Sequence, residues 1–295
     1  MTLSKKHHYI PRFYLKGFTD KENKYFVYDK NTGNIYRSNP ENTFAENHRN
    51  TAIIEDQNTK ELRKMDLAEH MLSRFDSKAA SALHDIVNSS PEDSILSPER
   101  LYAIQFLIFS VFWRTPINDG LRNAIIKNLS FKDLGFGIFD EKTGKRHIET
   151  EEMLRGLDAW VKLYPALLPI SSFTKKFNKI NKDEWRIYYH KTDLHIITDN
   201  PIIFHKEFKD LSSLQEELIV PLSSKILLIA TKKTKPKNLP PIFNLQVDLL
   251  LFHQAGRYAA SSDKTHLEFL AKTSKEYLTN PGWSEKLKET IFNHF

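Results

Sequence analysis

The spacing of hydrophobic residues predicts a block of helices in the middle of the chain. From about residue 60 to residue 87, apolar residues recur at steps of three and four, which indicates an amphipathic helix of about six or seven turns. The segment 100–113 is apolar on nearly every side, so we expect a central, buried helix that Ser97 caps and Thr115-Pro116 stops. Further helices are predicted at 121–129, 150–164, 245–256 and 284–292, and Pro165 and Pro169 should close the second of these.

β-forming residues flank short polar turns towards both ends of the chain. Hairpins are predicted from 25–28 with 35–37, from 185–190 with 195–198, and from 218–222 with 225–230, and short strands at 52–54 and 257–261. The order of strands, helices and strands predicts an α+β fold, in which a largely antiparallel sheet from the N- and C-terminal strands packs on a central helical block. We expect a single domain over residues 1–295, with the helical block at about 60–170 inserted between the β-rich ends.

Composition excludes several classes of protein. The chain has 295 residues, of which 40% are hydrophobic and 27% charged, as in ordinary soluble proteins. Nine glycines are few for a glycine-loop nucleotide fold, and the motifs HExxH, GxSxG and the Walker loop are absent. The absence of cysteine excludes disulfides, thiolate zinc sites and cysteine nucleophiles. The N-terminus has no apolar signal core, and the longest apolar run, 104–113, is well short of the roughly 20 residues that span a bilayer. A cytoplasmic protein with no membrane partner is therefore expected.

The net charge is compatible with an anionic partner but does not require one. The formal charge is +6 and the sequence pI is about 9.1. Such an excess suits nucleic acid or a nucleotide, and it equally suits plain surface charge or a partner protein.

The segment 5–18 gathers the side chains most suited to chemistry: two histidines, two tyrosines and four cations. In an extended chain His7 and His8 point to opposite faces. His8 is a candidate general base or metal ligand, because imidazole titrates near pH 6.5, whereas His7 is expected to lie exposed behind two lysines. The candidate substrate-binding residues are Arg12, Tyr14 and Lys16.

Further candidates lie in the helical block and at a strand end. Glu69 and Asp76 are two helical turns apart, roughly 10 Å, which is too far to share one ion but suits two polar contacts along a groove. Both carboxylates are equally compatible with a solvated helix face. Arg114 follows the buried helix, where a cation can cap the carbonyl end or clamp a phosphate. Asp199 and Asn200 end an apolar strand and can bind a metal, orient water or simply make a turn.

Taken together, these segments resemble the family called domain of unknown function 4238. The resemblance runs over about residues 5 to 262 and rests on the motifs at 8–15, 69–86, 113–116, 197–201 and 220–223. The family pattern leads us to expect Glu more often than Asp at position 76. Members occur in bacteria and their mobile elements, which implies a defence or toxin role, such as a nuclease-type effector in antiphage defence.

Two hypotheses of function remain open. In the first, the chain is a bacterial hydrolase of nucleic acid or a nucleotide, in which His8 is the general base or ligand and Arg114 holds phosphate. Asp199 and Asn200 would orient water or a divalent ion such as Mg²⁺ or Mn²⁺, and Glu69 would support the site. In the second, the chain is a non-catalytic binding protein, in which His8, Arg114 and Asp199 form a buried structural network.

Overall fold

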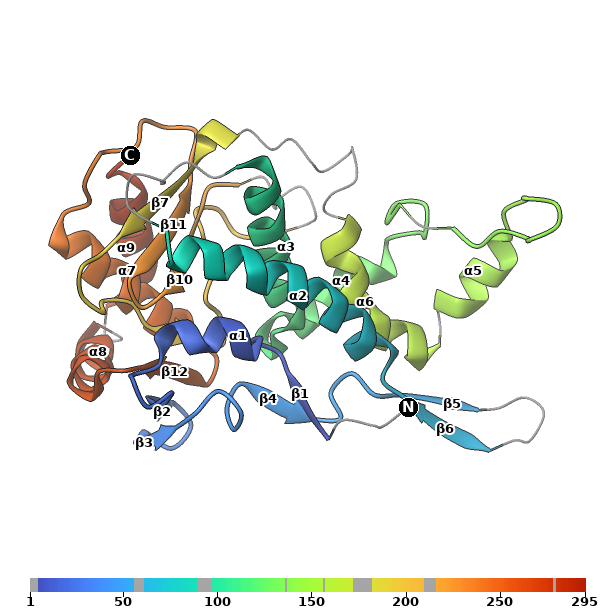
Figure 1. Ribbon diagram of the computed structural model, residues 1–295, viewed down its shortest axis with the longest axis horizontal. Coiled ribbons are helices and arrows are strands. Elements are labelled where there is room, and N and C mark those ends of the chain that lie inside the picture. The colour runs from blue at the N-terminus through green and yellow to red at the C-terminus, as the bar shows by residue number, and fades with distance from the viewer. Residues whose placement is uncertain are drawn as a thin grey trace.

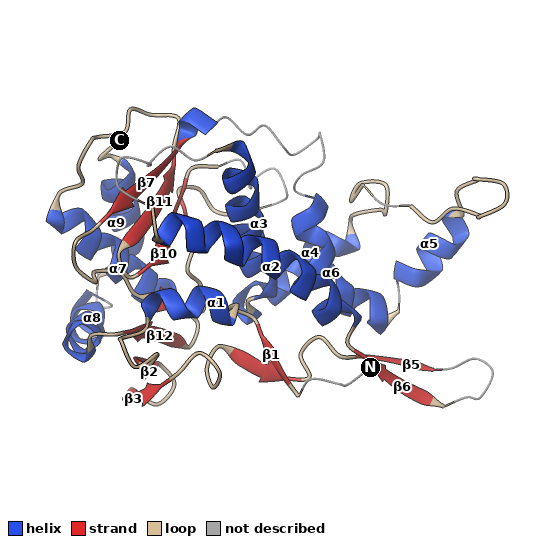
Figure 2. Cartoon of the chain, in the orientation of Figure 1, coloured by secondary structure: helices blue, strands red, loops and turns tan. Residues whose placement is uncertain are grey.

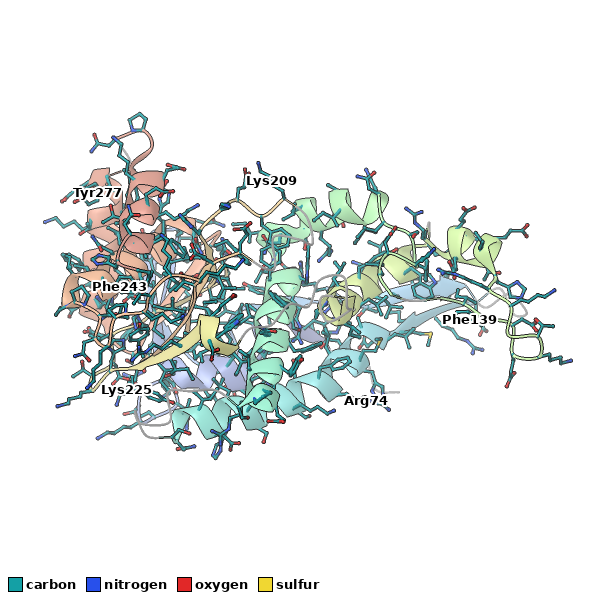
Figure 3. All side chains as sticks on the ribbon, turned by 90° about the horizontal axis from the view of Figure 1, so that it is seen from above. Arg74, Phe139, Lys209, Lys225, Phe243 and Tyr277 are labelled. Atoms are coloured by element: carbon teal, nitrogen blue, oxygen red, sulfur yellow. The ribbon has the colours of Figure 1, made fainter. Side chains whose placement is uncertain are left out.

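The computed structural model describes residues 5–55, 61–89, 97–135, 137–155, 157–171, 182–209, 216–277 and 280–295. In Figure 1 the two four-stranded sheets and the last helices lie at one end of an elongated molecule, and the helices of the middle of the chain extend towards the other end. Figure 3, seen from above, places Phe139 far from Phe243 and Tyr277 along this long axis.

One four-stranded sheet joins the two ends of the chain. Its order is β3 (Asn34–Ser38), β2 (Tyr25–Asp29), β12 (Tyr258–Ser261) and β8 (Ile197–Thr198), and every pairing is antiparallel. β12 thus lies between an early strand and a late one, with Val27 opposite Ala260. The predicted meeting of the β-rich ends in one antiparallel sheet is confirmed.

A second antiparallel sheet comes from the late strands alone. Its order is β7 (Trp185–Tyr189), β11 (Ile226–Ala230), β10 (Leu218–Ser223) and β9 (Ile203–Phe204). The β10–β11 hairpin is as predicted, and both strands are buried along their whole length. The predicted hairpin of 185–190 with 195–198 is wrong, because β7 pairs with β11 while β8 pairs with β12. β7 and β8 both have buried residues, but β7 lies in the second sheet and β8 in the first.

The central helices form the predicted block (Figure 2). They are α2 (Leu67–Val87), α3 (Pro98–Arg114), α4 (Asp119–Lys127), α5 (Ile148–Arg155) and α6 (Asp158–Ser171). As expected, Ser97 Oγ accepts a hydrogen bond from Arg100 N at the start of α3, and α3 is buried along most of its length. The predicted end at Pro165 and Pro169 is wrong, because both prolines lie inside α6. Packing against α2 and α3 holds α6 helical despite the lost backbone bonds.

The start predicted for the long helix is also wrong. Residues near its beginning form a hairpin of β5 (Ala52–Glu55) with β6 (Leu62–Met65), and α2 begins only at Leu67. Leu62 and Met65 are three residues apart, which matches a helix face but puts them on opposite faces of a strand. The pairing with β5, and not the local spacing, makes this segment a strand.

The N-terminal segment lies against both the helical block and the second sheet. β1 (Lys6–His8) pairs with β4 (Ala45–Asn47), and the short helix α1 (Arg12–Leu15) follows. Just beyond α1, a Cβ on Gly17 would lie 3.1 Å from Ser223 Cβ, so a larger residue here would have to push β10 slightly away. This contact fixes α1 beside the sheet.

Three further helices complete the fold: α7 (Pro241–Gln254), α8 (Lys264–Tyr277) and α9 (Trp283–Phe292). Their apolar faces form a second hydrophobic core with both sheets, separate from the core around α3. α8 was not predicted, because its polar face carries most of its residues and only a few positions, such as Leu267 and Leu270, are buried. Among the described residues, no helix is at once long and apolar enough to cross a membrane.

Candidate functional site

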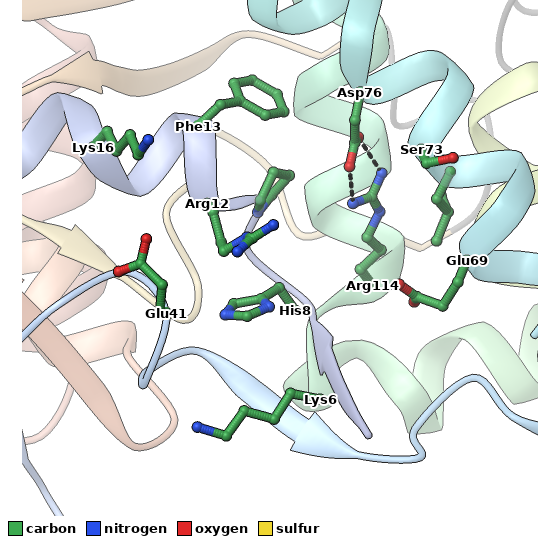
Figure 4. A pocket seen from close by; sticks show the side chains of 12 residues that line it. Lys6, His8, Arg12, Phe13, Lys16, Glu41, Glu69, Ser73, Asp76 and Arg114 are labelled. Carbon is green, nitrogen blue, oxygen red and sulfur yellow. Dashed lines mark hydrogen bonds and ion pairs between the residues drawn. The ribbon is translucent and has the colours of Figure 1, made fainter. Parts of the chain in front are cut away.

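A pocket of about 650 Å³ opens between the N-terminal segment and α2 (Figure 4). Most of its lining comes from β1 and α1 on one side and from α2 on the other. The lining residues are Lys6, His8, Pro11, Arg12, Phe13, Lys16, Glu41, Glu69, Leu72, Ser73, Asp76 and Arg114. Six of the candidates named from the sequence therefore share this pocket: His8, Arg12, Lys16, Glu69, Asp76 and Arg114.

His8 is held in one tautomer by the backbone. Its Nε2 lies 3.0 Å from the carbonyl oxygen of Pro40, which can only accept, so Nε2 carries the proton and donates. Nδ1 is then left with a lone pair, and it has no hydrogen-bond partner in the described part of the chain. Burial lowers the pKa of His8, and the nearby cations Arg12 and Lys6 lower it further. At neutral pH His8 is thus an uncharged acceptor, which is the state a general base requires.

Two cations, Arg12 at the start of α1 and Lys16 just after its end, face the pocket without a counter-ion among the described residues. Arg12 and Lys16 are four residues apart, so they lie on one face of the helical turns, and both are exposed. Neither has a hydrogen bond or ion pair from its side chain to any described residue. Lys6 Nζ, at the lower edge in Figure 4, donates to Asn42 Oδ1 at 2.9 Å. The site therefore offers two uncompensated cations beside a neutral imidazole.

Arg114 is already neutralised. Its guanidinium is only 3% exposed and donates to both carboxylate oxygens of Asp76, as the dashed lines in Figure 4 mark. Neither the helix-cap role nor the phosphate-clamp role considered from the sequence describes this arrangement, because the forked donors are occupied by a carboxylate from α2. Glu69 and Asp76 do both face the pocket, so the expectation of two polar contacts along one groove describes their placement.

Glu69 is fixed through a network that includes His7. Glu69 Oε1 accepts from Asn50 Nδ2 at 2.6 Å, and Asn50 N donates to His7 Nδ1 at 2.9 Å. The 3.8 Å approach of His7 Nδ1 to Glu69 Oε1 is therefore not an ionic bond, because Nδ1 is occupied as an acceptor. The expectation that His7 lies exposed is wrong: its side chain is fully buried, since the pairing of β1 with β4 turns His7 inward and His8 towards the pocket.

Tyr14 does not line the pocket. Its ring is buried and its hydroxyl donates to the carbonyl oxygen of Pro221. Burial raises the pKa of Tyr14 far above the usual value for tyrosine, so the hydroxyl stays protonated. Arg12 and Lys16 lie on the outer face of this helical turn, and Tyr14, two residues from each, lies on the opposite, inner face. The structure thus separates Tyr14 from the other two residues proposed to bind substrate, Arg12 and Lys16.

Asp199 and Asn200 do not line the pocket either. The carboxylate of Asp199 accepts from the backbone nitrogens of Gly256, Arg257 and Tyr258 at 2.6–3.0 Å. Burial raises the pKa of Asp199, and these three hydrogen bonds oppose the rise. Asn200 and Gln254 exchange hydrogen bonds between side-chain amides and carbonyl oxygens. Both residues therefore hold the start of β12 against the end of α7, away from the pocket where the other site candidates lie.

The pocket also contains residues that were not singled out from the sequence as site residues. Glu41, Ser73 and Phe13 line it, and Glu41 comes from the loop between β3 and β4. No local pattern marks Glu41, because its place depends on how this loop folds over β1. In the described residues, no group of three or more histidines and carboxylates is arranged to hold a metal ion. Since Asp76 is engaged with Arg114, the pocket carboxylates do not fit the Mg²⁺ or Mn²⁺ site considered from the sequence.

Comparison with known proteins gives one match. The model of a family described as "Protein of unknown function (DUF4238)" matches residues 6–265. No curated protein and no solved structure matches the chain.

Proposed function

We propose a function from the chemistry of the pocket, because this chain belongs to the DUF4238 family, whose description assigns no activity. The proposal is that the chain binds a phosphate ester of a nucleotide or nucleic acid in the pocket and hydrolyses it. His8 is the general base, and Arg12 and Lys16 bind the phosphate.

The single observation that carries the proposal is the state of His8 beside unpaired cations. Its Nε2–H is held by Pro40, its Nδ1 lone pair is unoccupied by any described residue, and its pKa is lowered. A water molecule between Nδ1 and a bound phosphate would lose its proton to Nδ1 as its oxygen attacks phosphorus and the bond to the leaving oxygen breaks. Arg12 and Lys16 supply positive charge for the phosphoryl oxygens, where negative charge is concentrated.

The decisive assay incubates the purified chain with labelled RNA, DNA and nucleotides, with and without Mg²⁺ or Mn²⁺. We expect His8→Ala to lower the rate of hydrolysis by a factor of about 10²–10⁴, the usual contribution of a general base. His70→Ala is the matched control, because His70 is exposed on α2 and does not line the pocket. A wild-type chain that leaves all of these substrates intact overturns the catalytic proposal. If the chain acts as an effector in antiphage defence, the same His8→Ala change abolishes protection in a plaque assay.

A second candidate, a binding protein without catalysis, is favoured by a different observation. The Arg114–Asp76 pair and the Asp199 cap are buried polar contacts that tie elements together. However, they do not form one network with His8, whose ring is hydrogen-bonded to the backbone of Pro40. The binding candidate predicts saturable binding of phosphate esters with no turnover. Under this candidate, the His8→Ala chain folds and, like wild type, hydrolyses none of them.

A further inference from the structure

The charges of the pocket change sign along its length. In Figure 4, Arg12 and His8 lie in the middle, Glu41 lies to one side beside Lys16, and Glu69 lies to the other. Neither Arg12 nor Lys16 is paired with a described carboxylate, and the side chain of Glu41 has no hydrogen bond to any described residue. Glu69 accepts a hydrogen bond from the neutral amide of Asn50. Both carboxylates therefore keep their negative charge facing the pocket.

This layout opposes a polyanion that runs through the pocket. Grooves that bind single-stranded nucleic acid track the backbone with positive charge over several nucleotides. Here a strand whose central phosphate lay on Arg12 would bring its neighbouring phosphates towards Glu41 at one end and Glu69 at the other. Like charges at short range repel, and the repulsion grows where the site is partly shielded from water.

The same layout suits a small ligand with one anionic group. A volume of about 650 Å³ lies within the range of small-molecule sites and accommodates a mononucleotide. Glu69 Oε1 is held by Asn50 at 2.6 Å, so the carboxylate is already oriented, and Oε2 is left to accept from a ligand. The exocyclic amino and ring N–H groups of a nucleobase are suitable donors for such a carboxylate.

We propose that the pocket is specific for a mononucleotide, with its phosphate on Arg12 and Lys16 and the N–H groups of its base on Glu69, and that Glu41 and Glu69 exclude longer nucleic acid. This inference deepens the proposed function and rests on it for the role of the site, but it is tested by binding alone. In this scheme Glu69 determines specificity for the base, and Glu41 repels the additional phosphates of longer nucleic acid.

The test is a set of calorimetric titrations of the full-length His8→Ala chain, in which slow turnover leaves the ligand intact. The probes are AMP, GMP, CMP, UMP, ribose 5-phosphate and a single-stranded oligonucleotide of about a dozen nucleotides without terminal phosphates. We expect each base-bearing monophosphate to bind about tenfold or more tightly than ribose 5-phosphate, since a hydrogen bond to a charged group contributes about that factor. The oligonucleotide should bind more weakly than the monophosphates.

Variants in the same background assign the roles. Glu69→Gln should reduce the preference for base-bearing ligands over ribose 5-phosphate, and Glu41→Gln should tighten oligonucleotide binding, whereas the exposed Glu152→Gln on α5 should change neither. Arg12→Ala should weaken every phosphate ligand. Its control is Arg74→Ala, because Arg74 lies on the surface of α2 and outside the pocket lining (Figure 3).

The outcomes separate this inference from the proposed function. If the oligonucleotide binds as tightly as AMP or GMP, or if ribose 5-phosphate binds as tightly as both, the inference is overturned while a hydrolase of nucleic acid still stands. If no probe binds, the inference also fails, and the hydrolysis assay with wild type and His8→Ala decides the proposed function by itself. Tight mononucleotide binding without any hydrolysis by wild type supports the ligand class and removes the catalytic role.

Discussion

Arg114 Nη1 and Nη2 donate to Asp76 Oδ2 and Oδ1 at 3.0 and 2.5 Å, across the interface between the end of α3 and the middle of α2. The guanidinium is 3% exposed while the Asp76 side chain is 24% exposed, so the cation depends on its partner far more than the carboxylate does. Both residues line the pocket, and the pair ties α2 to α3 at this wall.

Removing the carboxylate should therefore destabilise the protein strongly. Asp76→Ala leaves a buried, unpaired guanidinium, and we expect a loss of about 3–5 kcal/mol in the free energy of unfolding, measured by urea denaturation. Glu268→Ala, which breaks the exposed pair with Lys264, is the control and should cost about 0.3–0.5 kcal/mol. Equal effects of the two changes contradict the assigned role of the Arg114–Asp76 pair.

The pKa of His8 should lie below the ordinary histidine value of 6.5, because burial and two neighbouring cations disfavour its protonated form. Titration of the His8 ring by NMR measures this directly. Arg12→Ala should raise the pKa of His8 towards 6.5, since it removes one of these cations. Any hydrolysis that uses His8 as base should increase with pH through the His8 pKa and reach its plateau before neutrality. A His8 pKa above 6.5 contradicts the neutral-base state.

The contribution of Asp199 to the free energy of unfolding should depend on pH in the direction opposite to that of a carboxylate with a lowered pKa. Burial raises its folded-state pKa above the ordinary value of 3.8, so the folded chain binds the Asp199 proton more tightly than the unfolded chain. Its contribution therefore decreases as pH rises from 3.8 through the raised pKa. The measurement is the free energy of unfolding of wild type minus that of Asp199→Asn, across this range. Ligand binding in the pocket should not change in Asp199→Asn, because Asp199 does not line it.

A buried carboxylate between two histidines should give a trend in the same direction, but nearer neutrality. Asp248, which is 1% exposed, lies 3.2 Å from His195 Nδ1 and 2.9 Å from His266 Nε2. Burial lowers the pKa of His266, but the hydrogen bond and charge of Asp248 outweigh it and raise the pKa above 6.5. This stabilisation is complete below pH 6.5 and is lost as pH rises through the folded-state pKa of His266.

Thermal denaturation between about pH 5 and pH 9 tests the role of His266, since this window spans the ordinary titration range of histidine. The melting temperature of wild type should fall relative to that of His266→Ala as pH rises through the His266 pKa. His84→Ala is the control, because the His84 side chain is 77% exposed. A constant difference between wild type and His266→Ala over the whole range would show that Asp248 does not stabilise a protonated His266.

Some features of the pocket follow from local sequence, and others depend on distant segments. The spacing of Arg12 and Lys16, and the opposite faces of His7 and His8, are local properties of the backbone, so they survive in the structure. Which of the two histidines turns inward was decided by β4, a strand nearly forty residues away, and no local pattern carries that information. The same is true of Asp199, whose three backbone donors come from residues 256–258.

By itself, the sequence determined the α+β class, the buried helix α3 with its Ser97 cap, and the antiparallel sheet that joins the chain ends. These follow from hydrophobic periodicity and turn residues, which act over a few neighbouring positions. Only the tertiary structure decided that Arg114 is paired with Asp76, that Tyr14 and Asp199 are structural, and that Glu41 belongs to the pocket. Such outcomes depend on which distant groups meet once the elements pack, because a buried charge or hydroxyl takes whatever partner the fold brings within hydrogen-bonding distance.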